Sequence, residues 1–505
     1  MPPTVPPSFL HSMYGQAIFS PHYFSHLETE AFAEKVAIEI QAELRVLRES
    51  PTLDELFVDV MMGINDAETC LEKCLEEISV NTYDIVGFSV GFDCQKVPSI
   101  ALAKALKTRE PDIKVLWGGS GCDEEMAEAL MEVFEEIDAI VQGEAEATFL
   151  PMIRHLRGES AIDLKNSLLR MEGKIVKTDQ KPLPGVLDFI PLPDYETFIK
   201  TRSRTGYGED MLVLHFESSR GCWWGDKHHC KFCGIKAVSA ANYRNKSGNT
   251  TLSIIKDLTG LYQPDYLYAT DAILDLGYFK TLLPELTFLR KEKGLQLNLF
   301  YETKSNLSKK QVEVMSSAGI RGIQPGIEHF STNVLVLMDK GNSGIRNVEL
   351  LKWTLTYHME VVYGIILGTP GERQLDYDLL LELIPKITHL PPPLGANRLS
   401  LHRSSPYFWT PDEFAIQNIR PYELQRLIYQ TDDDHLLRML YEFKFDSPTI
   451  VYPEFKDKFQ ELTVLIDAWR QDFYDRYVEA QLDVILNSIK MDILKTMMVP
   501  CISAA

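Results

Sequence analysis

The stretch LVLHFESSRGCWWGDKHHCKFCG, residues 212–234, joins an apolar run to a loop that carries three cysteines. The leucine, valine and phenylalanine side chains between Leu212 and Phe216 predict a buried strand. The polar segment after it, with glycines and two tryptophans, predicts a loop at the carboxyl end of that strand. Cys222, Cys230 and Cys233 follow the spacing C-x7-C-x2-C. The sequence therefore places three thiols together beyond one strand end.

Three grouped thiols indicate a metal site. Three thiolates can hold three irons of a 4Fe-4S cluster, which leaves the fourth iron open to an exchangeable ligand. A structural zinc ion, bound by the same cysteines and by His228 or His229, is the alternative. Zinc ribbons and fingers usually pair two short ligand couples, and here the second couple is missing, so the spacing favours the cluster. Three inert buried cysteines fit a polar loop poorly.

Strands and helices alternate downstream of the cysteine loop, from about residue 211 to about residue 410. Six apolar runs predict strands at residues 212–218, 266–274, 295–305, 320–330, 359–372 and 397–408. Parallel strands joined by right-handed crossovers over six units predict a partial (β/α)6 barrel of the TIM type. Functional side chains are then expected at the carboxyl ends of the strands.

The same alternation is present upstream. Apolar runs at residues 83–92, 113–121 and 139–149 predict strands, and amphipathic segments at residues 66–80, 96–111 and 123–138 predict helices. This pattern predicts a parallel, doubly wound (Rossmann-like) α/β sheet with helices on both faces. Each strand ends in glycine: Gly91, Gly118 with Gly119, and Gly143 before Glu144. Taken alone, these glycines fit ordinary strand-to-helix turns better than a ligand site.

A proline-rich passage marks the first domain boundary. KPLPGVLDFIPLPDYE, residues 181–196, follows a predicted hairpin around residues 168–178 and predicts an extended connector. The alternation stops after Trp409, and the remaining residues predict mostly helices. We therefore expect three domains, at residues 1–195, 196–414 and 415–505.

The composition argues against a nucleic-acid-binding, membrane-spanning or disulfide-stabilised secreted protein. Its 51 basic and 72 acidic side chains give a net charge of −21 over 505 residues, which opposes binding to nucleic acid or to anionic lipid. No apolar run reaches the ~18 residues that a membrane span requires. The start of the chain lacks a basic leader and a long apolar stretch, so we expect no signal peptide and a cytoplasmic protein. Eight unevenly spaced cysteines indicate a reducing compartment rather than a disulfide scaffold.

The cysteine loop and two later strands resemble the radical S-adenosylmethionine (SAM) superfamily. An aromatic residue, Phe232, precedes the last cysteine, GIILGTPGE (residues 364–372) is similar to the superfamily strand that contacts adenine, and GIE (residues 326–328) is similar to the strand end near the ribose. Two features depart from the usual pattern. The first cysteine gap is seven residues rather than three, and Ala-Thr-Asp (residues 269–271) stands where a Gly-Gly-Glu motif usually binds the amino group of SAM.

The longer gap is similar to that of one cobalamin-dependent group within this superfamily, whose members modify ribosomally made precursor peptides. The resemblance extends to FYETKSNL (residues 300–307), RSSPYF (residues 403–408) and the N-terminal half, which is similar to the cobalamin-binding domain of that group. An Asp-x-His-x-x-Gly motif is absent from the sequence, so the resemblance implies cobalamin without a histidine ligand below the cobalt.

The resemblance implies three sets of site residues. Cys222, Cys230 and Cys233 would hold a 4Fe-4S cluster. The residues implied to bind SAM are Phe232, Asp271, Glu302, Lys304, Glu328, Gly364, Ile366 and Gly368. The residues implied to contact cobalamin are Ser89, Gly91, Gly118, Gly119, Gly143 and Glu144. For each polar residue, a surface ion pair or a buried structural partner is the alternative role. No other catalytic residue is assigned.

The implied reaction is reductive cleavage of SAM to a 5′-deoxyadenosyl radical, followed by C-methylation of an unactivated carbon in a ribosomal precursor peptide. An external one-electron reductant would be a partner. The same chemistry on a small metabolite, or a non-methylating rearrangement or cyclisation, is the alternative. A non-catalytic regulator that binds cobalamin or zinc is disfavoured, because it would need neither residues 364–372 nor residues 324–328.

Overall fold

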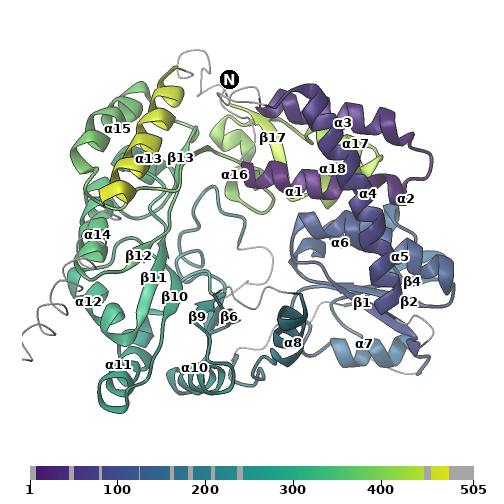
Figure 1. The fold of residues 1–505 in the computed structure, drawn as a ribbon, viewed down its shortest axis with the longest axis horizontal. Coiled ribbons are helices and arrows are strands. Elements are labelled where there is room, and N and C mark those ends of the chain that lie inside the picture. Colours follow the sequence, from purple (N-terminus) through teal and green to yellow (C-terminus); the bar gives the residue numbers. More distant parts are fainter. Residues whose placement is uncertain are drawn as a thin grey trace, which may run out of the picture.

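The computed structural model describes residues 7–44, 51–78, 82–123, 125–159, 164–179, 186–205, 211–235, 243–447 and 457–476. Two main sheets organise these residues. Figure 1 shows the N-terminal sheet and the larger sheet of the second half on opposite sides of the view.

The N-terminal sheet has five strands in the order β1-β2-β3-β4-β5. They are β1 (Ile85–Ser89), β2 (Lys114–Gly118), β3 (Ala139–Val141), β4 (Ser167–Met171) and β5 (Lys174–Lys177). β1, β2 and β3 are parallel, and the β4–β5 hairpin extends the sheet antiparallel to β3. The predicted alternation and the predicted hairpin are confirmed.

Helices cover this sheet on both faces. They are α4 (Leu53–Glu77), α5 (Lys96–Arg109), α6 (Glu125–Val133) and α7 (Phe149–Leu156). Trp117 and Ile140 share one core with α5 and α6, whereas Leu116 and Val141 pack with Met152 of α7. Among the described strands the order runs in one direction without a reversal, so the prediction of a doubly wound order is wrong. Right-handed crossovers in a sheet without a reversal bring successive helices, here α5 and α6, to one face, while α7, which precedes the antiparallel β4, covers the other.

Parallel strands also form the larger sheet, in the order β12-β11-β10-β9-β6. They are β6 (Val213–Phe216), β9 (Tyr266–Ala269), β10 (Leu299–Thr303), β11 (Ile320–Pro325) and β12 (Glu360–Val361). β13 (Ile365–Leu367) pairs with β14 (Ala396–Arg398), and a bridge from Glu328 to Ile365 links this pair to the chain after β11. The segment predicted as one strand, residues 359–372, is thus divided at Gly364. The parallel sheet is confirmed, and its six-unit barrel stays a prediction.

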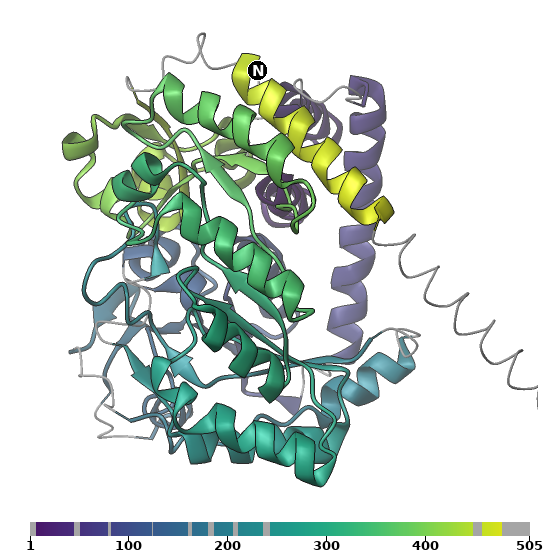
Figure 2. The same cartoon turned by 90° about the vertical axis from the view of Figure 1, so that its left-hand side faces the viewer.

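A helix layer covers the outer face of this sheet and faces the viewer in Figure 2. Its members are α10 (Gly248–Tyr262), α11 (Leu282–Lys293), α12 (Lys309–Ala318), α13 (Thr332–Leu337), α14 (Gly344–Thr356) and α15 (Gln374–Ile387). Local sequence fixes where α12 begins and ends. Ser308 and Gln311 form a capping box at its start, and Gly319, with φ of +99°, ends it in the left-handed region that glycine tolerates.

The segment after β14 returns to the N-terminal side of the molecule. It contains β15 (Leu401–His402), α16 (Pro406–Trp409), β16 (Gln417–Arg420), α17 (Glu423–Tyr429), α18 (Asp433–Met439) and β17 (Glu442–Asp446). Figure 1 shows β17 beside the first helices, which are α1 (Pro7–Ala17), α2 (Ser20–Tyr23) and α3 (Thr29–Leu44). Ile428 and Phe443 share a core with Phe32 and Val36 of α3. The region after residue 414 adds strands β16 and β17, but most of its described residues are helical, as predicted, and the three-domain division itself stays a prediction.

The last described helix, residues 457–476, packs on the larger sheet's helix layer and is the yellow helix of Figure 2. Leu462, Ile466 and Trp469 are buried in one core with Tyr377 of α15. The indole Nε1 of Trp469 donates to the carbonyl oxygen of Leu390 at 2.9 Å. Within the described ranges, no helix combines the length and the apolarity needed to cross a bilayer.

We expect Trp469→Ala to lower the free energy of unfolding by about 3–5 kcal/mol, because it removes a fully buried indole and leaves a cavity. Chemical denaturation followed by circular dichroism measures the change. Tyr474→Ala is the matched control, since Tyr474 lies on the same helix and is 52% exposed. Equal losses in the two variants would contradict the packing role of Trp469.

Candidate functional site

A buried carboxylate anchors the start of the cysteine loop. Asp271, which follows β9, accepts hydrogen bonds from the Ser218 amide at 2.8 Å, the Ser218 hydroxyl and the Ser219 hydroxyl at 2.9 Å. Burial raises the pKa of Asp271 to about 6, although these donors act against the rise. Both oxygens of this predicted SAM ligand therefore already have partners in the strand end that carries the cysteines. A contact with the SAM amino group stays a prediction.

The three predicted cysteines come together. Cys222, Cys230 and Cys233 line one small cavity with Trp224 and Ile235. Burial raises the pKa of Cys230, and it raises the pKa of Cys233 to about 11. Buried thiols of this kind release their protons when a metal binds.

His228 and His229, the additional ligands of the zinc alternative, have other contacts in the structure. The ring of His228 stacks on Trp224 at 4.0 Å, and Nε2 of His229 lies 2.8 Å from the carbonyl oxygen of Cys233. In the described ranges, no three histidine, cysteine, aspartate or glutamate side chains lie close enough to hold one metal ion. A 4Fe-4S cluster makes a different demand, because each cysteine binds a different iron and the sulfurs need not converge on one point.

Two lysines lie beside the cysteines. Nζ of Lys304 lies 3.3 Å from the ring centroid of Trp224 and donates to the carbonyl oxygen of Lys340. Burial and the positive charge of Lys340 lower the pKa of Lys304 to about 8. Lys340 itself pairs with Glu328 at 2.9 Å. Lys340 is not predicted from the sequence, because its place two residues after Met338 gives no signal from spacing alone.

Two predicted carboxylates differ in their surroundings. Glu328 has φ of +58°, and its carboxylate pairs with Lys340. If Glu328 binds the ribose of SAM, the same carboxylate must contact both the ribose and Lys340. Glu302, at the carboxyl end of β10, has no hydrogen-bond or ion-pair partner for its carboxylate among the described residues. Burial raises the pKa of Glu302 to about 7, with a further contribution from the negative charge of Glu328. An unpaired, partly buried carboxylate is available to a cationic ligand.

The predicted adenine strand is β13. The amide of Ile366 donates to the carbonyl oxygen of Glu328 at 2.8 Å, and the amide of Gly368 donates to Glu372 at 2.7 Å. Both amides therefore already have acceptors within the chain. Ile366 and Phe232 pack at the edge of the same core. Contacts of Phe232, Gly364, Ile366 and Gly368 with SAM stay predictions.

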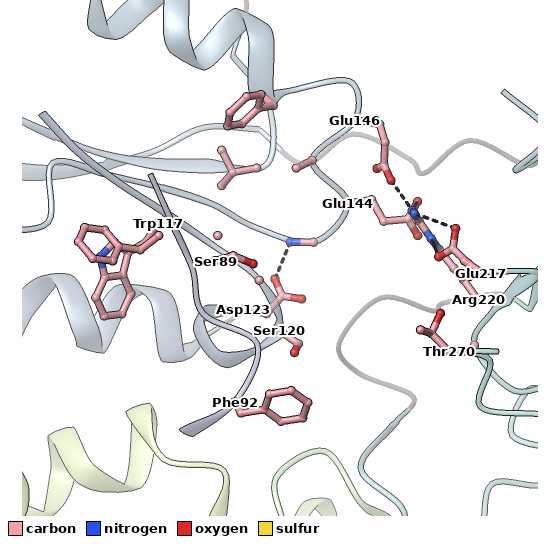
Figure 3. A pocket seen from close by; sticks show the side chains of 18 of the residues that line it. Ser89, Phe92, Trp117, Ser120, Asp123, Glu144, Glu146, Glu217, Arg220 and Thr270 are labelled. Atoms are coloured by element: carbon pink, nitrogen blue, oxygen red, sulfur yellow. Dashed lines mark hydrogen bonds and ion pairs between the residues drawn. The ribbon is translucent and has the colours of Figure 1, made fainter. Parts of the chain in front are cut away.

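A large cavity of about 1020 Å³ lies between the two sheets. Its walls come from the carboxyl ends of β1, β2 and β3 on one side and from residues around β6, β7 (Ser219–Arg220), β9 and β10 on the other. Figure 3 shows Ser89 and Asp123 on one side, Thr270 on the other, and Glu144 beside Arg220. Ile235 lines both this cavity and the cysteine cavity, so the two adjoin.

Five of the six residues predicted to contact cobalamin line this cavity: Ser89, Gly118, Gly119, Gly143 and Glu144. Gly119 has φ of +107°, and a Cβ there would lie 2.6 Å from the carbonyl oxygen of Val90. A Cβ on Gly143, whose φ is +66°, would meet nothing within 4 Å. Gly91 is not among the lining residues, and its amide donates to Gln95 at 2.8 Å.

The chemistry of the walls fits a large amide-bearing ligand. Glycines keep the backbone open at the strand ends, and the carboxylate of Glu302 supplies an acceptor, whereas Glu146 and Glu217 pair with Arg220. Glu144 is less free than the sequence indicates, because Arg220 holds it at 2.8 Å and Arg244 also pairs with it. The volume exceeds the roughly 300–1,000 Å³ of ordinary small-molecule pockets.

Comparisons with curated proteins find distant relatives, and no protein-family model matches the chain. An uncharacterized methyltransferase of Pyrococcus horikoshii is 23% identical over 315 residues, which cover 60% of this chain and 64% of the relative. The hopanoid C-2 methylase of Rhodopseudomonas palustris is 26% identical over 226 residues, covering 44% of this chain and 40% of the relative. The chain thus spans less than two thirds of the length of either protein.

Similarity to solved structures covers more of this chain than similarity to the curated proteins does. The radical SAM methyltransferase TsrM of Kitasatospora setae, with tryptophan substrate and a SAM analogue, superposes with a TM-score of 0.58 at 15% identity, covering 80% of this chain and 82% of TsrM. A second TsrM structure holds cobalamin and a [4Fe-4S] cluster. OxsB, a cobalamin-dependent SAM radical enzyme, gives a TM-score of 0.55 at 15% identity, over 84% of this chain and 62% of OxsB. The chain therefore shares the α/β fold of solved cobalamin-dependent radical SAM enzymes.

Proposed function

We propose that this chain is a cobalamin-dependent radical SAM enzyme that transfers a methyl group to an unactivated carbon. One observation carries the proposal: three thiols at a strand end adjoin, through Ile235, a large glycine-walled cavity between the two sheets. A zinc site or a cobalamin-binding regulator would need only one of these two features. The comparisons support the proposal, since their proteins combine this fold with methyl transfer.

The chain's residues would divide the work as follows. Cys222, Cys230 and Cys233 would hold a 4Fe-4S cluster, and the cavity would hold cobalamin. When bound, the cluster supplies the electron that cleaves SAM, and cobalamin carries the methyl group. Lys304 would attract the SAM carboxylate, because its ammonium group lies beside the cysteine loop. Glu302 would accept hydrogen bonds from the amino group and attract the sulfonium charge, since no side chain of the described chain neutralises it.

The substrate we propose is a ribosomal precursor peptide, on the resemblance of the sequence to peptide-modifying enzymes. A small molecule is the second candidate, because the similar TsrM structure contains tryptophan as substrate. An external one-electron reductant completes the proposed set of partners.

Metal content tests the cofactors. Anaerobically reconstituted protein supplied with hydroxocobalamin should contain about four irons and one cobalt per chain. Cys230→Ala should lose most of the iron and all deoxyadenosine formation while it keeps its fold. The control is Cys70→Ala, because Cys70 is an exposed cysteine on α4. One zinc and no iron in the wild-type protein would overturn the proposal.

The affinity for SAM should rise with pH. Glu302, with its pKa raised to about 7, is mostly neutral at pH 6 and ionised at pH 8, whereas Lys304, with its pKa lowered to about 8, loses about half of its charge by pH 8; the dissociation constant should therefore fall about fivefold across this interval. Glu302→Gln should remove this gain and bind weakly at pH 6, and still more weakly at pH 8 as Lys304 loses its proton. Isothermal titration of the reconstituted protein measures both effects. Glu313→Gln, at a solvent-exposed pair with Lys310, is the control and should keep the wild-type profile.

Methyl acceptors can be distinguished directly. Reconstituted enzyme should methylate a ribosomal precursor peptide, detected by mass spectrometry, and should leave free tryptophan unchanged. Methylation that depends on Cys230 but occurs only on free amino acids would replace the peptide with the small-molecule candidate.

A further inference from the structure

Arg220 lies at the junction of the two sheets and of the two cavities. It belongs to β7, immediately after β6 and two residues before Cys222. Its side chain reaches across the large cavity's rim to the loop after β3, which belongs to the other sheet. Figure 3 shows the guanidinium between Glu144 and Glu146 on one side and Glu217 on the other. No role was expected for this arginine from the sequence.

Three carboxylates surround the guanidinium. Nη1 lies 2.8 Å from Glu144, Nη2 lies 2.5 Å from Glu146, and Nε lies 2.5 Å from Glu217. The three contacts use three different nitrogens, which the planar fork of arginine permits and a lysine ammonium does not. Burial opposes ionisation of Glu146, but the hydrogen bond and charge of Arg220, a backbone hydrogen bond and the charge of Lys246 together lower its pKa.

Two further cations close the network. β8 (Arg244–Asn245) pairs antiparallel with β7, with Arg220 opposite Arg244. Arg244 also pairs with Glu144, and Lys246 pairs with Glu217 at 2.8 Å. Arg244 is 8% exposed and Lys246 is 1% exposed. Three cations and three carboxylates thus balance one another in a largely buried place, where an unbalanced charge would be costly.

This ion-pair network fixes the relative positions of the loop after β3 and the cysteine loop more than it adds to the free energy of folding. A buried ion-pair network is a weak contributor to folding free energy, yet the loss of one partner leaves other charges uncompensated. Other pairs already join the N-terminal side to distant segments, such as Arg438 with Glu132 and Arg403 with Glu125 at 3.2 Å. The docking of the two sides therefore does not depend on Arg220 alone.

We propose that Arg220 is a positioning residue that holds the loop Gly143–Glu146 against the start of the cysteine loop. The inference rests on the proposed function: it assigns to Arg220 the spacing between a corrin in the large cavity and a cluster on the three cysteines. Glu146 and Glu217 are its main partners, and Arg244 keeps Glu144 in place beside it. A corrin in the large cavity would then form one wall of the reaction site, and the cysteine loop would form the other.

The test compares Arg220→Gln, Arg220→Lys, Glu146→Gln and the double variant Arg220→Gln/Glu146→Gln with the wild type. Arg438→Gln is the matched control, because it breaks another long-range pair away from the cavity. The readouts are iron content, the dissociation constant for hydroxocobalamin from its absorbance spectrum, and hydrogen exchange of peptides covering residues 139–149 and 217–235.

We expect Arg220→Gln to retain its iron, to weaken cobalamin binding by about tenfold or more, and to speed exchange in both peptides. Arg220→Lys should resemble it, since one ammonium cannot replace three directed donors. The double variant should be no weaker than Arg220→Gln, because Glu146 acts through Arg220. Arg438→Gln should match the wild type.

Wild-type affinity and exchange in Arg220→Gln would overturn the inference, as would an equal loss in Arg438→Gln. If the wild-type protein binds no cobalamin, the proposed function fails, but exchange in the two peptides still decides whether Arg220 holds the loops together. If Arg220→Gln does not fold, Glu146→Gln takes its place: faster exchange in both peptides supports the inference, and unchanged exchange refutes it.

Discussion

Parallel strands joined by crossovers must all end at the same edge of their sheet, and the rest of this structure depends on that constraint. In the N-terminal sheet it brings Ser89, Gly118 and Gly143 to one edge, although 54 residues separate the first from the last. In the larger sheet it brings the cysteine loop, Asp271 and Glu302 to another. The two edges face each other across one cavity. Glycines, cysteines and carboxylates that carry little information singly form a site here because the topology brings them to the same cavity.

The sequence predicts what depends on short spacing and misses what depends on distant partners. Apolar periodicity was enough to locate the strands of both sheets, and the C-x7-C-x2-C loop identified the thiols that share a cavity. Lys340 and Arg220 escaped prediction because a lone basic residue has no pattern until its carboxylate partners are known. Glu144 was expected to face a ligand, but its oxygens hold Arg220 and Arg244. The division of residues 359–372 into two strands follows from the bridge between Glu328 and Ile365, a contact that periodicity does not encode.

Several charges of the site are arranged in pairs. Glu328 has Lys340, Glu217 has Lys246, and Glu144 and Glu146 have Arg220. The carboxylate of Glu302 has no hydrogen-bond or ion-pair partner among the described residues. Fixed, mutually compensated charges cost no reorganisation when a ligand enters, so the paired groups shape the site. The unpaired group is left to respond to the ligand's own charge.

The core shared by the two ends of the chain also determines when, during synthesis, the N-terminal helices can complete their packing. Helices α1 and α3 pack on α5 and α4 and also share a core with β17 and α17, and the hydroxyl of Tyr429 donates to Gln16 across 413 positions of sequence. A ribosome releases Gln16 long before Tyr429, so part of the apolar surface of the early helices stays uncovered in the meantime, a state in which chaperones commonly act. The core that supports the N-terminal wall of the cavity closes only once this late segment has emerged.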